Sequence, residues 1–332
     1  MRTKIVYVTV SNGKDNYLEQ LYMSLVSLKM HNPNSHSSVV VDRITEKVIS
    51  KVNYDLKSYI DDLIIIDVPT KYQGAVCSRY LKTSLRSYVT GPYLFIDTDT
   101  IVSENLEDID ELIDREIDVA AVVDGHCPFK EMPNYSEIVE RYNKIGWLDL
   151  LSDEYHFNSG VMFVADTKAV HDFYEQWHQN WLYEYSKHYY FDQIALARTD
   201  HDMGGLLAEI DGIWNFQLYW GALRYLCKAK IVHYGGYSRR LETYYFRTIG
   251  VPERIRATGK IDSETFEHLQ NPKEAYVGNS LVLGNEYQKL LRSKMNIEFM
   301  YHPHRFQIFD SVASFLQHTG EFVRNMLTCQ HN

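Results

Sequence analysis

The chain has 332 residues, of which 45% are hydrophobic and 23% charged, a balance typical of a globular protein with a substantial core. Its formal net charge of −10 argues against nucleic acid as the main partner, because phosphate backbones are bound by basic surfaces. No stretch is long and apolar enough to span a bilayer, and the N-terminus enters a strand pattern without a secretory signal.

The cysteines indicate neither a zinc site nor a dense disulfide framework, because they are far apart and form no C-x-x-C pair. This usage fits a reducing compartment, so we expect a cytoplasmic protein. The four positions are Cys77, Cys127, Cys227 and Cys329.

Strands and helices are predicted to alternate along most of the chain. Short apolar runs bounded by turns predict the strands, and apolar residues at helical spacing predict the helices. Strands are expected at 5–10, 39–41, 63–66, 93–96, 119–123, 160–164 and 231–232, and helices at 18–31, 79–88, 167–185 and from 191 onward.

This alternation predicts an α/β fold with a largely parallel central sheet and helices on both faces. The first strand–helix turn has no G-x-G-x-x-G, so a dinucleotide-binding fingerprint is absent. After about residue 240 the alternation stops. We therefore expect a catalytic domain over 1–240 and a mainly helical C-terminal extension over 241–332.

The stretch around which the chain is organised is a buried strand, Tyr93–Ile96, that breaks off into two carboxylates. Side chains alternate along an extended chain, so Asp97 and Asp99 point to one side and Thr98 to the other. Two like charges so close are costly without a cation between them, and hard oxygen ligands suit Mg²⁺ or Mn²⁺. The alternative is an ordinary polar turn, since Asp and Thr favour turns.

Further motifs follow in a fixed order along the chain. They are the first strand ending in Thr9 with Tyr17 beyond it, Arg79-Tyr80, Phe95-Ile96-Asp97-Thr98-Asp99, Phe157-Asn158-Ser159-Gly160-Val161-Met162-Phe163, Asp192-Gln193, Trp214-Asn215 and His233-Tyr234-Gly235. In this order they resemble the GT-A glycosyltransferases of family 8, the type that includes glycogenin and bacterial galactosyl- and glucosyltransferases. The resemblance covers roughly residues 4–240 and implies a Rossmann-like GT-A fold.

The resemblance also implies roles for individual residues. Asp97, Asp99 and His233 match the family's metal ligands, Mn²⁺ being its usual ion with Mg²⁺ as the alternative. Asp192 and Gln193 match the residues near the reacting carbon. The positions assigned to donor and nucleotide binding are Thr9, Tyr17, Arg79, Asp97, Thr98, Asp124, Asn158, Ser159 and Arg239.

Each of these positions has a plainer structural interpretation. Most histidines are structural, so His233 need not be a ligand. Arg79 could be a solvated helix residue, Asn158 could simply start a strand, and Asp192 could cap a helix. The sequence also departs from the family where Ser11–Lys14 intervene before Asp15-Asn16-Tyr17, and where Arg239 or Arg240 replaces a lysine as the phosphate cation.

The activity implied is transfer of a hexose from a nucleotide sugar, commonly a UDP-sugar, to an acceptor hydroxyl with retention of configuration. The acceptor would be a glycan, a glycolipid or a protein. A front-face displacement, in which the departing phosphate takes the acceptor's proton and Gln193 stabilises the cationic sugar, fits this expectation. A covalent route through Asp192 is the alternative.

Two other functions compete with this one. A sugar-1-phosphate nucleotidyltransferase would need a Gly-rich, basic loop after the first strand, but Ser11–Asn16 holds one Gly and one Lys. A non-catalytic sugar-binding module would not need the complete set of Asp97, Asp99 and His233.

The C-terminal stretch carries an apolar face at helical spacing. Arg305 and Arg324 are offset by Asp310 and Glu321, so the segment lacks the basic excess that holds helices on anionic lipid. We therefore favour packing against the catalytic domain, with weak peripheral membrane association as the alternative. The apolar residues are Val312, Phe315, Leu316, Phe322, Val323, Met326 and Leu327.

Overall fold

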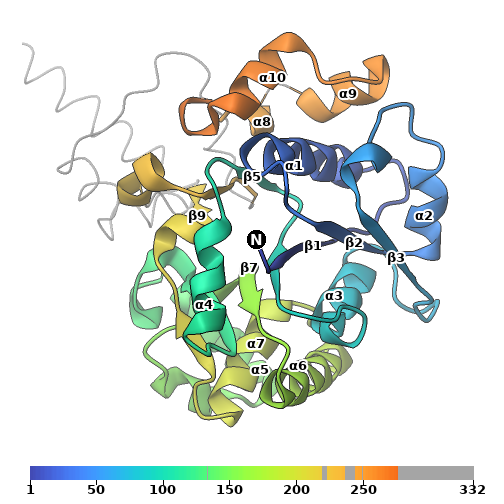
Figure 1. Ribbon diagram of the computed structural model, residues 1–332. Coiled ribbons are helices and arrows are strands. Elements are labelled where there is room, and N and C mark those ends of the chain that lie inside the picture. The colour runs from blue at the N-terminus through green and yellow to red at the C-terminus, as the bar shows by residue number, and fades with distance from the viewer. Residues whose placement is uncertain (133, 219–222, 236–243, 249, 276–332) are drawn as a thin grey trace, which may run out of the picture. The chain divides into compact units, whose positions relative to one another are not determined.

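The structure is a computed structural model and describes residues 1–132, 134–218, 223–235, 244–248 and 250–275 (Figure 1). Arg239, the pair His302 and His304, and the C-terminal apolar face all lie outside these residues. The boundary expected near residue 240 and the helical character of 241–332 as a whole therefore stay predictions.

A seven-stranded sheet forms the centre of the molecule, in the order β3-β2-β1-β4-β7-β6-β8. All neighbouring strands run parallel except at β7, which is antiparallel to β4 and to β6. The predicted α/β class with a largely parallel sheet is confirmed. The strands are β1 (Lys4–Val8), β2 (Ser37–Asp42), β3 (Asp62–Ile66), β4 (Tyr93–Ile96), β6 (Val119–Val123), β7 (Phe157–Val164) and β8 (Leu207–Glu209).

The two faces of the sheet bury alternate residues of each strand. Ile5 and Tyr7 of β1 join one apolar core, whereas Val6 and Val8 join the other. Helix α1 (Tyr17–His31) covers the first face, and α3 (Ala75–Thr83) and α6 (Lys168–Ser186) cover the second, as Figure 1 shows. Helices on both faces follow from strands that are apolar on both sides.

Strand β7 begins earlier than the predicted start at Gly160. Its first residue pairs with β6, Phe157 facing Val123, on the far side of a register shift. The strand therefore carries Asn158 and Ser159 within the sheet, buried, rather than in the loop before it. The predicted helix over 79–88 is also displaced, because α3 begins after Gly74, whose positive φ of 54° suits glycine.

A second, three-stranded sheet was not predicted. It consists of β5 (Thr100–Val102), β9 (Phe216–Gln217) and β10 (Ile231–His233), in the order β5-β10-β9. Strand β10 runs antiparallel to β5, so His233 pairs with Thr100. This sheet brings the end of β10 next to the residues that follow β4.

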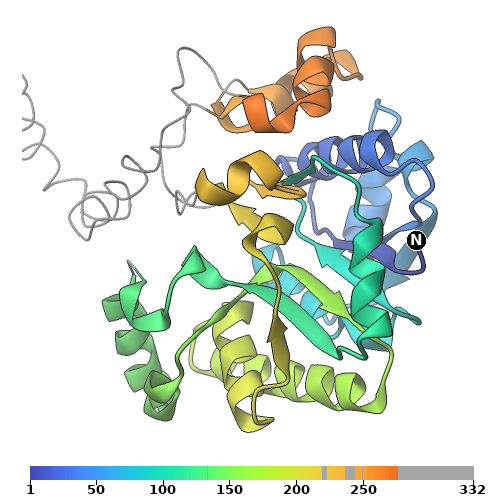
Figure 2. The same cartoon turned by 60° about the vertical axis from the view of Figure 1, so that its left-hand side comes forward.

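The remaining helices surround these sheets. Helices α9 and α10 pack on α1, and Figure 2 shows them in orange above the blue α1. Within the described part of the chain, no helix combines the length and hydrophobicity needed to cross a membrane. These helices are α2 (Arg43–Ile49), α4 (Glu111–Asp114), α5 (Tyr135–Ile145), α7 (Asp192–Asp202), α8 (Tyr245–Thr248), α9 (Val251–Thr258) and α10 (Ser263–Gln270).

Candidate functional site

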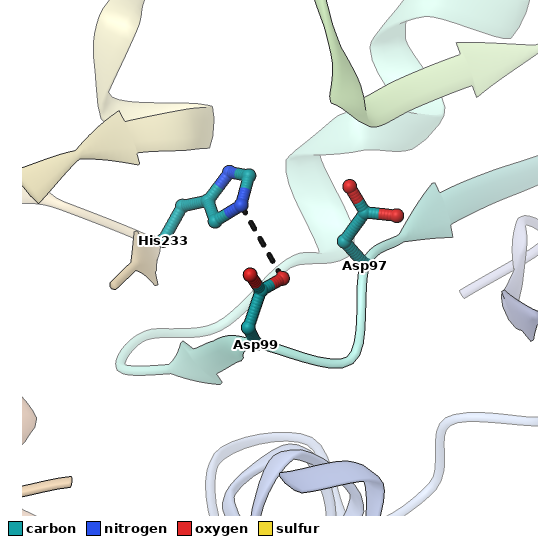
Figure 3. A group of neighbouring side chains, drawn as sticks. All are labelled: Asp97, Asp99 and His233. Carbon is teal, nitrogen blue, oxygen red and sulfur yellow. Dashed lines mark ion pairs between the residues drawn. The ribbon is translucent and has the colours of Figure 1, made fainter. Parts of the chain in front are cut away.

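The centre of the candidate site is a cluster of Asp97, Asp99 and His233. Each offers one ligand atom, and these atoms all lie within 4.8 Å of one another. Figure 3 shows the three side chains converging from the end of β4, the start of β5 and the end of β10, with an ion pair of 3.4 Å between His233 Nε2 and Asp99 Oδ1. The two carboxylate side chains are each 31% exposed, so the cluster is open to a ligand.

The turn between β4 and β5 is fixed by backbone contacts. The Asp97 N–H donates to the Gly160 carbonyl at 2.8 Å, and the Thr100 hydroxyl donates to the Asp97 carbonyl at 2.8 Å. The Tyr234 N–H donates to the Asp99 carbonyl at 3.1 Å. Thr98 lies in the turn between the two carboxylates. The strand and its neighbours therefore set the spacing of Asp97 and Asp99.

Two glycines leave the room that the cluster occupies. A Cβ on Gly235 would overlap the Asp99 carboxylate. A Cβ on Gly160 would overlap the His233 ring and lie 2.9 Å from Asp97 Oδ2. Any other residue at these positions would displace a side chain of the cluster, which gives a steric reason for glycine at both.

The charges of the cluster shift one another's protonation. Burial, and then the nearby Asp99 charge, raise the pKa of Asp97 against the opposing charge of Lys82. Burial disfavours the ionised form of Asp99 too, but His233 outweighs it and lowers the pKa of Asp99. Two carboxylates and an imidazole in this geometry suit a divalent cation, and a nitrogen ligand favours Mn²⁺ over Mg²⁺.

A second group of charges lies beside the cluster. Lys82 Nζ is 3.3 Å from Asp97 Oδ1 and 2.8 Å from Asp192 Oδ2. Ser159 Oγ donates to Asp192 Oδ2 at 2.8 Å, and Arg79 Nε lies 3.3 Å from Asp192 Oδ1. Burial of Asp192 opposes its ionisation, but Lys82 and Arg79 outweigh it and hold the pKa of Asp192 far below its usual range.

Lys82 was missed in the sequence, although a signal for it exists. Arg79 and Lys82 are three residues apart on α3 and so face the same side of the helix. The structure brings both to Asp192, and Lys82 is almost completely buried between Asp97 and Asp192.

A chain of hydrogen bonds links His233 to Gln193. His233 Nδ1 is 3.0 Å from Asn215 Oδ1, and Asn215 Nδ2 donates to Asn158 Oδ1 at 2.8 Å. Asn158 Nδ2 donates to Asp124 Oδ1 at 2.9 Å, and Gln193 Nε2 donates to Asp124 Oδ2 at 2.5 Å. His233 donates through Nδ1 to Asn215, so Nε2 is the ring nitrogen that is left to face the cluster.

Two predicted site residues lie toward the start of the chain. Tyr17 begins α1, is 48% exposed, and is close enough to Arg79 to interact with it electrostatically. Thr9 follows β1 and is buried, and its hydroxyl has no hydrogen-bond partner within the described part of the chain. Within the described part of the chain, Tyr17 is thus in electrostatic reach of Arg79, whereas the Thr9 side chain makes no hydrogen bond to the other predicted residues.

Helix α6 fixes the start of α7, which carries Asp192 and Gln193. Trp177 Nε1 donates to the Asp192 carbonyl at 2.9 Å, and the Phe191 N–H donates to Glu184 Oε1 at 3.3 Å. Glu184 is fully buried, and burial raises the pKa of its carboxyl to about 8. A carboxyl that resists ionisation therefore lies directly beneath the helix start.

No protein-family model matches the sequence, and no curated protein matches it either. Solved structures do resemble the fold. The galactosyltransferase LgtC, in complex with donor and acceptor sugar analogues, superposes with a TM-score of 0.52 at 18% sequence identity, over 86% of this chain and 99% of that chain. The mouse xyloside xylosyltransferase 1 superposes with a TM-score of 0.46 at 14% sequence identity, over 70% of this chain and 97% of that chain. GlyE of Streptococcus pneumoniae superposes with a TM-score of 0.46 at 16% sequence identity, over 85% of this chain and 67% of that chain. The likeness to LgtC shows that the chain has the GT-A fold, and the predicted resemblance is confirmed at that level.

A larger residue at Gly235 should weaken metal binding. In Gly235→Ala the new methyl group would displace the Asp99 carboxylate, so we expect the Mn²⁺ dissociation constant to rise roughly 10–100-fold, as for changes that misorient ligands. Electron paramagnetic resonance of free Mn²⁺ during a titration measures this. The metal-free melting temperature reports whether the variant folds. Wild-type affinity in a folded variant would contradict the assignment of Asp99 as a ligand.

Glu184 should make stability fall as the pH rises. Because its pKa is raised from 4.5 to about 8 on folding, the folded chain holds a proton that the unfolded chain loses between these values. The free energy of unfolding of the wild type should therefore decrease across this window. Glu184→Gln removes the contribution of Glu184 to this slope and should be more stable than the wild type at pH 8 by at most about 4 kcal/mol.

Urea unfolding at pH 5 and pH 8 measures the effect of Glu184→Gln. The matched control is Glu175→Gln, an exposed glutamate on the same helix, which should leave the pH dependence of the wild type unchanged. An equal difference between wild type and Glu184→Gln at both pH values would show that Glu184 ionises normally in the folded chain.

Proposed function

We propose that the chain is a metal-dependent glycosyltransferase that moves a hexose from a UDP-sugar to an acceptor hydroxyl with retention of configuration. The observation that carries the proposal is the cluster of Asp97, Asp99 and His233 at the carboxyl end of β4. In open α/β sheets, ligands bind at the carboxyl ends of the strands. The GT-A fold of the chain supports the same reaction class by analogy.

Asp97, Asp99 and His233 would hold the ion, which we take to be Mn²⁺ or Mg²⁺. When bound, a divalent cation supplies Lewis-acid stabilisation of a diphosphate leaving group. The carboxylate side chains are partly exposed while His233 is only 8% exposed, so the ligand would approach from the carboxylate side.

The side chains around the ion would bind and orient the donor. Arg79 is 38% exposed and is oriented by Asp192, so its remaining N–H groups are available to a phosphate or sugar oxygen. Tyr17, with an exposed ring and hydroxyl, would contact the nucleotide. Asp124, Asn158 and Ser159 belong to the buried hydrogen-bond network next to the cluster and would orient the sugar, with Thr98 in the turn. Thr9 stays a donor-binding candidate from the resemblance alone, and Arg239 stays a candidate phosphate cation in place of the family's lysine.

The surroundings of Asp192 support a front-face reaction over a covalent one. One of its oxygens accepts from Ser159 and pairs with Lys82, while the other faces Arg79. A carboxylate held by three such partners is a poor nucleophile, because each stabilises its charge in place. We therefore propose that Asp192 orients Arg79 and Lys82. The departing phosphate then takes the proton of the acceptor hydroxyl.

Gln193 is the candidate for stabilising the cationic sugar. Its amide nitrogen is held by Asp124 at 2.5 Å, which fixes the rotation of the side chain. Its amide oxygen accepts no hydrogen bond from the described residues, so we assign that oxygen to the positive charge that develops at the reacting carbon.

The proposed partners are a nucleotide-sugar donor and a glycan, glycolipid or protein acceptor. The LgtC structure contains donor and acceptor sugar analogues, and we extend that pairing to this chain. We also propose a cytoplasmic location, which rests on the spacing of the cysteines in the sequence.

The loop after β1 weighs against the nucleotidyltransferase alternative. The Asp15 carboxylate accepts from the Ser11 hydroxyl at 2.7 Å and from the Asn12 and Tyr17 N–H groups at 3.2 Å. A loop closed on its own carboxylate does not present amide groups to a phosphate chain as such an enzyme requires.

Donor hydrolysis separates the three functions. The full chain is incubated with Mn²⁺ and a panel of UDP- and GDP-sugars, with and without EDTA. Metal-dependent release of nucleoside diphosphate from a UDP-sugar is the expected result. Release of pyrophosphate from a nucleoside triphosphate and a sugar 1-phosphate would instead indicate the nucleotidyltransferase. Binding of sugars without turnover of any donor would indicate the binding module.

Asp99→Asn should abolish turnover while leaving the fold intact. The substitution keeps the shape of the side chain and removes one charge of a repelling pair, so the melting temperature should change little. We expect kcat to fall at least about 100-fold. Asp114→Asn, at an exposed carboxylate on α4, is the control and should keep wild-type turnover. Turnover of Asp99→Asn within a few-fold of wild type would refute the metal assignment.

A further inference from the structure

Helix α9 follows the candidate metal ligand His233 in the chain, yet it contacts the loop that follows β1. Arg256 on α9 donates through Nη2 to the Asp15 carbonyl and, at 2.8 Å, to Asn16 Oδ1. Glu253, one turn earlier, accepts from Asn16 Nδ2 at 2.9 Å. Both ends of the Asn16 amide are therefore held by α9.

The contacts of Asn16 with α9 replace a hydrogen bond that a residue at this position normally makes within α1. Asn16 occupies the N-cap position of α1, where asparagine normally accepts from a backbone N–H of the first turn. Its side chain makes no capping hydrogen bond here. The docking of α9 thus takes the place of the cap, and the start of α1 depends on a segment more than 200 residues away for this contact.

Arg256 is anchored by a buried carboxylate. Its Nε and Nη2 lie 3.1 and 2.9 Å from the two oxygens of Glu19, a bidentate pair. Glu19 is 4% exposed and also accepts from the Tyr54 hydroxyl at 2.9 Å. Since Glu19 is fixed from two sides, the guanidinium is held at a defined place against the loop.

The loop and Arg256 line the same pocket. The pocket measures about 300 Å³, and its lining includes Gly13, Asp15, Val48, Tyr54 and Arg256. A loop that borders such a space can move into it when a contact that holds the loop is lost. Tyr17, which directly follows Asn16 and is 48% exposed, would move with the loop, and Tyr17 is a donor-binding residue under the proposed function.

We propose that Arg256 is a positioning residue for nucleotide binding, holding the Asp15–Asn16 turn so that Tyr17 is kept in the place from which it would contact the nucleotide. The inference rests on the proposed function, since it assigns the Tyr17 side of the site to the nucleotide. On this proposal, α9 supports the donor site through the Asp15–Asn16 turn and does not itself contact the ligand.

The test compares Arg256→Ala with a matched variant on the same helix, Arg254→Ala. Arg254 also forms an ion pair, 3.0 Å to Asp262 against 2.9 Å for Arg256 to Glu19, and the two arginine side chains are 33% and 37% exposed. Arg254 bonds Asp262, Tyr245 and Thr265, so its loss also perturbs α9, whereas the bonds to the Asp15 carbonyl and to Asn16 Oδ1 come from Arg256.

Isothermal titration of the full chain with UDP in Mn²⁺, and kinetics with the accepted UDP-sugar, give the readouts. We expect Arg256→Ala to raise the UDP dissociation constant and KM about tenfold with kcat within about threefold, and Arg254→Ala to leave the dissociation constant within about twofold. Arg256→Lys keeps a positive charge beside Glu19 but cannot form the bidentate pair, so it should recover part of the UDP affinity that Arg256→Ala loses. Amide hydrogen exchange over residues 13–17 should accelerate in Arg256→Ala alone.

If Arg256→Ala fails to fold, Asn16→Ala removes the bonds to the loop while keeping the Arg256–Glu19 pair, and should raise the dissociation constant about threefold. Unchanged UDP affinity in a folded Arg256→Ala, or equal losses in both arginine variants, would overturn the inference while leaving the proposed function standing. A wild-type chain that binds no nucleoside diphosphate would overturn the proposed function and this inference with it.

Discussion

The repulsion between two carboxylates at the end of one buried strand is the constraint on which the rest of the site depends. Asp97 and Asp99 follow β4 directly and face the same way, so each needs a compensating charge. Lys82 from α3 supplies it for Asp97, and His233 from β10 supplies it for Asp99. The two partners come from opposite sides of β4, so the packing of α3 and β10 against this strand end brings a compensating charge to each carboxylate. The bare Cα atoms of Gly160 and Gly235 then leave the space in which four side chains can meet.

The second sheet is what makes His233 available to this strand end. Strand β5 leaves β4 after a short turn, and β10 pairs with it so that His233 faces Thr100. Asn215, next to β9, then orients the imidazole through Nδ1. The same asparagine bonds Asn158 in β7, so a polar connection joins the small sheet to the large sheet at this point. A buried network of this kind specifies a geometry because an unpaired amide in it would be costly. The position of His233 is thus set by two sheets at once.

The parts of this structure that could be predicted are those in which the signal is local. The alternation of strands and helices, and the two carboxylates after Tyr93–Ile96, are visible in short windows of sequence. The small sheet could not be predicted, because β9 and β5 are two and three residues long and show no periodicity. Lys82 could have been found from its spacing to Arg79, but nothing in the sequence places Asp192 opposite it. The link between Arg256 and Asn16 depends on chain segments 240 residues apart, which no local pattern encodes.

Under the proposed function, the balance of charge explains why a cation and an anionic donor would bind together. Three carboxylates, those of Asp97, Asp99 and Asp192, lie close to one another at the site. Among the described residues, Lys82 and Arg79 are the permanent cations that pair with them. Carboxylates therefore outnumber these cations, and a diphosphate approaching such an opening alone would be repelled. A divalent ion offsets that excess at Asp97 and Asp99, where the like charges are closest. Within the described part of the chain, the fixed charges near Asp97 and Asp99 thus agree with the proposal of a donor that binds together with its metal.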